Sequence, residues 1–185
     1  AMDLEGSAYS HPPLGALTLA AHTPADVEVR VLDESVAPVD LDATAELVGI
    51  SAMYIQRERA FELADRLRAL GRTVVRGGGL VSALPDECAR HADVCFFGEA
   101  ERTWPEFVED YRDGRHGSRY AANERFDMTE ARTPRYDLLD MRDYSTGSVQ
   151  TSRGCPFRCE FCDVPRFDGN RARTKTVEQV MIEVR

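Results

Sequence analysis

The chain has 185 residues, of which 43% are hydrophobic and 30% are charged, a mixture typical of a globular protein of about one domain. It holds no apolar run near the roughly 18 residues that a membrane span needs, and its first residues lack the basic and apolar regions of a signal peptide. The net charge of −9 argues against binding of nucleic-acid phosphates, so we expect a cytoplasmic protein that binds neither nucleic acid nor membrane.

The first part of the chain alternates between helical and strand-like patterns. An apolar helix is predicted over residues 12–21, and a valine-rich alternating strand over residues 27–33. Residues 47–53 form a continuous apolar run, which is typical of a strand buried on both faces. Residues 56–70 repeat their apolar positions at helical spacing, and Gly71 is a plausible C-terminal stop for that helix.

The same alternation continues to about residue 114. A strand over 73–76 runs into three glycines, a short helix follows over 85–91, and a second strand covers 94–97. Residues 101–111 place Trp104, Phe107, Val108 and Tyr111 on one helical face. Strands and helices in alternation predict an α/β fold with a parallel sheet covered by helices, of the Rossmann-like or flavodoxin-like kind.

Small and flexible residues follow the predicted strands at their carboxyl ends, where parallel sheets of this kind bind ligands. We therefore expect a ligand crevice lined by Ser51, Gly77, Gly78, Gly79, Gly98 and Glu99. The alternative is that these glycines only make tight turns between strands and helices.

The chain changes character after residue 114. Residues 115–147 are polar and aperiodic, and we interpret them as a linker anchored by Tyr120, Phe126, Tyr136 and Tyr144. A strand is then predicted over 148–152 and a helix over 175–185. From residue 148 onward seven Lys and Arg face five Asp and Glu, a sum of +2, so residues 1–147 carry −11. The charge and the pattern place a domain boundary at the same point.

Three of the five cysteines, Cys155, Cys159 and Cys162, fall within eight residues. Thiolates suit zinc and iron–sulfur clusters, but a structural zinc site needs four ligands and no fourth ligand follows Cys162. Three cysteines on a four-iron cluster leave one iron free to bind a substrate or cofactor. The alternatives are a zinc site completed by another chain, or three reduced thiols. Cys88 and Cys95 are expected to be buried, unreactive side chains.

The spacing Cys155-x3-Cys159-x-Phe161-Cys162 resembles the signature of the radical S-adenosylmethionine (radical SAM) superfamily. The surrounding string, residues 151–165, resembles the subgroup with an N-terminal cobalamin-binding-like domain. The segments Pro12-Pro13-Leu14-Gly15, Val48-Gly49-Ile50-Ser51, Gly77-Gly78-Gly79 and Gly98-Glu99-Ala100-Glu101 stand in the order that this subgroup shows. The resemblance covers nearly the whole chain.

The resemblance implies roles for individual residues. Cys155, Cys159 and Cys162 would hold a [4Fe-4S] cluster, whose open iron would bind S-adenosylmethionine, and Phe161 would lie beside its adenine. One electron from the cluster would cleave the sulfonium to start radical chemistry, as in a methyltransferase or a cyclase. A small-molecule substrate and an electron donor such as flavodoxin or ferredoxin are implied. The three units would be a cobalamin-binding-like domain (1–114), a linker (115–147) and the first β/α unit of a TIM-type barrel (148–185).

The chain departs from the family pattern at two places. It lacks the D-x-H-x-x-G string whose histidine ligates cobalt, so His11, His22, His91 and His116 are expected to be surface or capping residues. Two alternatives stay open, namely cobalamin bound without a histidine, and a cobalamin-free scaffold or substrate module. A plain α/β binding domain with a zinc loop is the alternative outside the family.

The second departure is the segment before Pro12. Residues 3–10 are not strand-like, although the family opens with a central strand there. We therefore expect an inactive fragment with a gap in its sheet between residues 27–33 and 47–53. Residues 148–152 are the best candidate to fill that gap, which predicts a dimer with exchanged segments.

Overall fold

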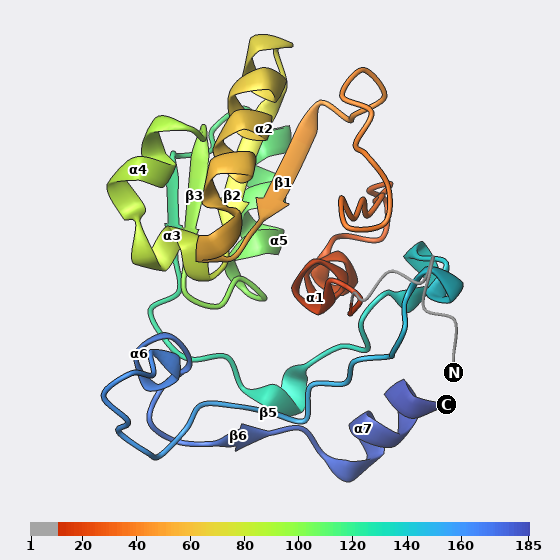
Figure 1. Ribbon diagram of the computed structural model, residues 1–185, viewed down its shortest axis with the longest axis vertical. Helices are drawn as coiled ribbons and strands as arrows, with labels where there is room; N and C mark the ends of the chain where they lie inside the picture. Colours follow the sequence, from red (N-terminus) through yellow and green to blue (C-terminus); the bar gives the residue numbers. More distant parts are fainter. Residues whose placement is uncertain (1–10) are drawn as a thin grey trace, which may run out of the picture.

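The computed structural model describes residues 11–185, and its centre is a sheet of four parallel strands (Figure 1). The strands are β1 (Leu47–Ser51), β2 (Thr73–Gly77), β3 (Val94–Phe97) and β4 (Arg119–Ala121). They lie side by side in chain order, and each adjacent pair is parallel. The predicted α/β class, with a Rossmann-like parallel sheet and flanking helices, is confirmed.

Helices cover both faces of this sheet, because successive side chains of a strand point to opposite faces. On one face, Val74 and Cys95 pack with side chains from the three helices α2 (Arg57–Ala69), α3 (Gly79–Ala83) and α4 (Pro85–Arg90). On the other face, Phe96 packs edge-on against Phe107 of helix α5 (Thr103–Arg112), with ring centroids 5.4 Å apart. Figure 1 shows α2 in front of the strands and α5 behind them.

Helix α1 (Leu14–His22) lies where the sequence predicted a helix, and it packs beside α5 rather than on the strands. The contact is fixed by the indole Nε1 of Trp104, which donates a hydrogen bond to the hydroxyl of Thr23 at 2.9 Å. Thr23 directly follows α1, so this bond joins the end of one helix to the beginning of the other.

Residues 27–33 form no strand, and that prediction was wrong. A valine-rich alternating segment becomes a strand only where a neighbour pairs its backbone groups. Within the described residues, β1 pairs with β2 alone, and residues 27–33 pair with no strand of the sheet. Arg30 instead donates to the carbonyl of Ala43 at 2.7 Å. The prediction that residues 3–10 form no strand lies outside the described residues.

The prediction that residues 148–152 enter the sheet was also wrong. The strand here is β5 (Ser152–Arg153), and it pairs antiparallel with β6 (Arg173–Thr174) in a separate ladder. The hairpin satisfies its own backbone groups, because Lys175 N also donates to the carbonyl of Thr151 at 2.9 Å. The dimer with exchanged segments stays a prediction, but residues 148–152 do not fill the sheet in this structure.

The stretch predicted as a linker contributes a strand to the sheet. β4 lies within it, and Tyr120 of β4 stacks on Phe96 with ring centroids 5.2 Å apart. Beyond β4 the chain makes short 3-10 turns along the surface, at η2 (Met128–Glu130), η3 (Tyr136–Leu138) and η4 (Met141–Asp143). The four aromatic residues anchor the stretch as expected: Tyr120 and Phe126 are buried, and the hydroxyls of Tyr136 and Tyr144 donate to Ser148 O and Asp33.

The chain after β5 runs through a long loop, helix α6 (Val164–Asp168), β6 and helix α7 (Val177–Val184). Thr176 caps α7, since its hydroxyl accepts from Gln179 N at 3.2 Å while the Gln179 side chain accepts from Thr176 N. A strand and a final helix were predicted here, whereas the β5–β6 hairpin was not. Among the helices of residues 11–185, none combines the length and apolarity that crossing a bilayer requires.

Candidate functional site

The carboxyl ends of β1–β4 form one edge of the sheet, called the carboxyl edge below, and Ser51 and Gly78 meet there. Ser51 is paired in register with Gly77 of β2. Gly78 has a φ of +83°, and a Cβ placed on it would lie 3.3 Å from the Ser51 hydroxyl. Because Ser51, Gly78 and Gly79 are all exposed, the glycines leave open backbone beside a hydroxyl at this edge.

Gly98 turns the chain at the end of β3. Its φ is +78°, and a Cβ there would lie 3.4 Å from the Cβ of Ala122, just beyond β4. The contact distance is ordinary, so it is the left-handed φ that favours glycine at this turn. That Gly98 lines a common crevice with Ser51 and Gly78 stays a prediction.

Exposed apolar side chains lie directly after β1, next to Ser51. Met53, Tyr54 and Ile55 are 66%, 55% and 87% exposed, and Tyr54 and Ile55 belong to the short turn η1 (Tyr54–Gln56). The sequence analysis did not identify them, although three large apolar residues between a strand and a polar helix are a usable signal. A flat, largely apolar macrocycle fits an edge that offers bare glycine backbone and apolar side chains.

Glu99 was predicted to line the crevice, and in this structure its side chain is held in ion pairs. Its side chain is only 7% exposed. Its carboxylate accepts from Arg173 through both oxygens at 2.9 Å, from Arg153 at 3.0 Å and from Phe126 N at 2.8 Å. Burial by itself would raise the pKa of Glu99, but the hydrogen bonds from Arg173, Phe126 N and Arg153 lower it below its ordinary value.

Glu99 belongs to a buried group of four charges, called the edge cluster below. Its members are Glu99, Glu101, Arg153 and Arg173. Arg153 joins the two acids, with its Nη1 at 2.5 Å from the Glu101 carboxylate, and its side chain is 14% exposed. Burial opposes the charged form of Arg153, but Glu101 and Glu99 raise its pKa nevertheless. Two acids facing two arginines satisfy the condition under which buried charges are tolerated.

His22 lies beside the edge cluster and is 7% exposed, so the expectation of a surface or capping residue was wrong for it. Its ring stands edge-on to Phe126, with centroids 5.5 Å apart, and its Nε2 has no hydrogen-bond partner among residues 11–185. Burial lowers its pKa, with Glu101 opposing and Arg132 and Arg153 adding to the shift. His22 is therefore a neutral, packed side chain at neutral pH.

The three clustered cysteines lie on the loop between β5 and β6, called the cysteine loop below (residues 154–172). Cys155 N donates to Gly169 O at 3.0 Å, and Cys162 N to Cys159 O at 3.1 Å. None of the three forms a disulfide, and Cys159 is exposed. Across residues 11–185, no three metal-binding side chains lie close enough to share one ion. The donor set of three free thiols nevertheless matches the chemistry of an iron–sulfur cluster.

Gly154 at the base of the cysteine loop was not identified from the sequence. Its φ is +89°, and a Cβ there would lie 3.0 Å from the carbonyl carbon of Arg171 and would clash with its oxygen. Only glycine lets the two arms of the loop approach this closely. Phe161 in the same loop is 93% exposed, and its contact with an adenine stays a prediction. Figure 1 shows the loop and α6 beyond the end toward which β1 points.

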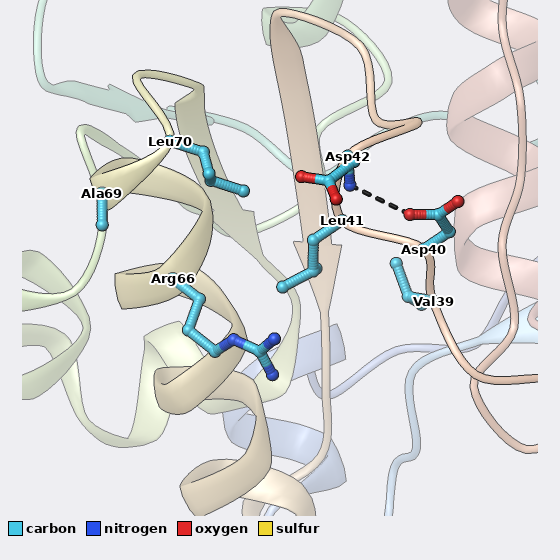
Figure 2. Close-up of a pocket in the computed structure, with 7 residues that line it drawn as sticks. All are labelled: Val39, Asp40, Leu41, Asp42, Arg66, Ala69 and Leu70. Carbon is cyan, nitrogen blue, oxygen red and sulfur yellow. Dashed lines mark hydrogen bonds between the residues drawn. The ribbon is translucent and has the colours of Figure 1, made fainter.

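A cavity of about 450 Å³ lies elsewhere, and it contains no predicted site residue. Figure 2 shows Ala69 and Leu70 at the end of α2, together with Leu41 and Arg66. Because Leu70 comes just before β2 begins, this cavity is at the amino-terminal edge of the sheet. The Asp40 carboxylate accepts from Asp42 N at 3.1 Å and is thus used within its own turn. The chemistry-bearing residues therefore gather at the opposite edge.

Comparison with known proteins gives matches along the whole chain. The family described as the B12 binding domain matches residues 4–108. An uncharacterized methyltransferase of Synechocystis sp. is 38% identical over 186 residues, covering 99% of this chain and 35% of the relative. The hopanoid C-2 methylase of Rhodopseudomonas palustris is 34% identical over 178 residues, covering 94% of this chain and 34% of the relative. The chain thus spans about a third of the length of these relatives.

A solved structure has the same fold. It is that of the cobalamin-dependent S-adenosylmethionine radical enzyme OxsB with aqua-cobalamin bound, and it superposes with a TM-score of 0.78 at 19% identity. The superposition covers 100% of this chain and 30% of that one. At this identity the likeness concerns the fold, and it extends through the hairpin that carries the cysteines.

Proposed function

The chain belongs to the B12-binding domain family, and from this premise we propose that it binds cobalamin at its carboxyl edge. The observation that carries the proposal is the contact between Ser51 and Gly78, where open backbone lies beside a hydroxyl. Met53, Tyr54 and Ile55 supply the apolar surface on which the macrocycle would rest. Cobalamin, when bound, supplies a carrier for a methyl group.

We propose that no histidine of this chain ligates the cobalt. His91 is held by Asp65 at 2.8 Å, and His11 by Thr146 at 2.7 Å. His22 is packed against Phe126, and His116 lies against the rings of Phe107 and Tyr111. These contacts hold each ring against other residues of the chain, which supports binding in the histidine-free manner.

We propose further that the cysteine loop holds a [4Fe-4S] cluster through Cys155, Cys159 and Cys162, with S-adenosylmethionine on the open iron and Phe161 beside its adenine. The cluster supplies the electron that cleaves the sulfonium of S-adenosylmethionine. The chain's own part is to present three free thiols on a loop whose base is fixed by buried ion pairs.

The whole reaction that we propose is methylation of a small-molecule substrate by a longer protein of which these residues are a part. Relatives named as a methyltransferase and as a methylase match 99% and 94% of this chain, which supports this reaction class. Residues 1–114 and 148–185 would then carry the two cofactors, with 115–147 between them. The electron would come from a donor such as flavodoxin or ferredoxin.

Titration of the chain with aquacobalamin tests the first step. We expect saturable binding, with an absorption spectrum that stays the same when each of the four histidines is replaced in turn by Gln. Free corrinoid after gel filtration would contradict cobalamin binding and would favour a cobalamin-free scaffold. A spectral change in one histidine variant alone would instead identify that histidine as a cobalt ligand.

A further inference from the structure

The edge cluster connects the sheet to the base of the cysteine loop. Glu99 follows β3 directly after Gly98, whereas Arg153 and Arg173 face each other in the register of the β5–β6 hairpin. Both arginines bind the same carboxylate, and the two positions lie 54 and 74 residues away from it in the sequence. One side chain therefore holds both arms of the loop.

The contacts of Glu99 use its full capacity for hydrogen bonds. Oε1 accepts from Arg153 and Arg173, and Oε2 accepts from Arg173 and from Phe126 N. The pairing with Arg173 is of the fork-to-fork kind, which fixes direction as well as distance. Arg173 also donates to the carbonyls of Asp168, at 2.8 Å, and Phe126. The carboxylate thus sets the orientation of the arm that connects α6 to β6.

The edge cluster is much less exposed to solvent than the ion pairs on the surface of this chain. The side chains of Glu99 and Arg173 are 7% and 19% exposed. By contrast, those of Arg102 and Glu130, which pair at 2.9 Å, are 57% and 54% exposed. Removing one partner of a buried pair leaves an uncompensated charge, whereas an exposed pair is replaced by water at little cost.

We propose that Glu99 is a positioning residue, which holds the cysteine loop in one orientation against the carboxyl edge and so fixes the separation between the iron–sulfur cluster and the corrinoid. The role rests on the proposed function, since it concerns the relative placement of both cofactors. Glu99 touches neither cofactor site itself, because its oxygens are all occupied by the two arginines and Phe126 N.

The first test uses the chain without cofactors. In Glu99→Gln, hydrogen exchange of peptides from residues 154–172 should become at least about tenfold faster, while peptides of β1 and β2 keep their rates. The matched control is Glu130→Gln, the same change in an exposed pair, and it should leave the loop rates unchanged. Equal loop rates in Glu99→Gln and wild type would overturn the proposal.

The second test uses protein loaded with both cofactors and reduced so that cobalt and cluster are paramagnetic. Magnetic coupling between them depends on their separation, and it should change in Glu99→Gln while iron and corrinoid contents stay at wild-type levels. A role confined to folding would alter the contents and leave the coupling of the loaded fraction unchanged, which would overturn the proposal. Should circular dichroism show that Glu99→Gln is unfolded, Arg173→Lys replaces it, since it keeps the charge and removes the fork.

The cofactor contents and the magnetic coupling distinguish failure of the proposed function from failure of the role of Glu99. If wild-type protein retains neither corrinoid nor iron, the proposed function is wrong, and with it the positioning of cofactors. If it retains both and the coupling in Glu99→Gln equals that of wild type, only the role of Glu99 is wrong.

Discussion

Gly154 lies so close to Arg171 that any side chain on the glycine would collide with the carbonyl of that arginine. The contact closes the cysteine loop at its base, one residue before the first cysteine. Gly114 offers a comparison, since its φ is also positive, at +66°, but a Cβ placed on it would have no atom within 4 Å. A side chain at Gly154 would therefore cause both backbone strain and a steric clash, whereas a side chain at Gly114 would cause backbone strain alone.

Replacing Gly154 by Ala should weaken the closed loop by about 2–4 kcal/mol, the combined cost of a left-handed alanine and a backbone clash. Gly114→Ala carries the strain alone and should cost about 1 kcal/mol. Hydrogen exchange of residues 155–170 measures the first effect, and chemical denaturation measures the second. Equal exchange of the loop in Gly154→Ala and wild type would show that the contact with Arg171 is unimportant.

Replacing Gly78 by Val should reduce the affinity for aquacobalamin about tenfold or more, because the side chain would enter the space next to Ser51. Gly114→Val is the control, since it adds the same side chain at a positive φ with open space around it. Absorbance titration of both variants gives the comparison. Unchanged affinity in Gly78→Val would contradict a ligand role for this turn.

Replacing Cys159 by Ala should abolish binding of the iron–sulfur cluster after anaerobic reconstitution, because a three-cysteine site has no spare ligand. The control is Cys88→Ala, which removes a buried thiol of the core and should leave the iron content unchanged. Iron and sulfide analysis provides the measurement. Full iron content in a variant lacking Cys155, Cys159 and Cys162 would disprove the assignment.

The stability of the chain should fall below about pH 6.5 in part through His22. Burial lowers the pKa of the folded state below the ordinary value of 6.5, so the unfolded chain binds the proton first as pH falls. The contribution is therefore constant above that value and is lost between it and the lower folded pKa. His22→Gln should flatten this part of the curve in urea denaturation between pH 5 and 8. An identical curve would contradict the assignment.

The sequence predicted β1, β2 and β3 because each is a short, mainly apolar segment with serine or glycine at its end or directly after it. It failed at residues 27–33, whose pattern is equally strand-like, because pairing depends on a neighbour that local pattern does not report. β4 was missed for the opposite reason. It has three residues, of which only Tyr120 is buried. The polar sequence around it therefore shows no strand pattern, and only its pairing with β3 makes it a strand.

At the candidate site, the glycines were predictable and the charges were not. Positive φ at Gly78 and Gly98 follows from strands that must turn sharply. Glu99 was assigned to the crevice because it follows a strand, but its side chain turns to Arg153 and Arg173. The sequence does show two arginines, Arg153 and Arg173, on either side of the cysteine loop. Which acids they meet depends on the tertiary fold.

The burial of the edge cluster determines how the cysteine loop responds to its surroundings. Salt at about 0.1 M screens charges over about 10 Å of water, but water scarcely enters a cluster whose side chains are 6–19% exposed. Ionic strength therefore weakens the surface ion pairs of this chain and leaves the loop attached. Heating also leaves the loop attached, because the free-energy cost of desolvating the buried charges falls as temperature rises. The attachment of the loop is thus least sensitive to the two conditions that most easily loosen protein surfaces.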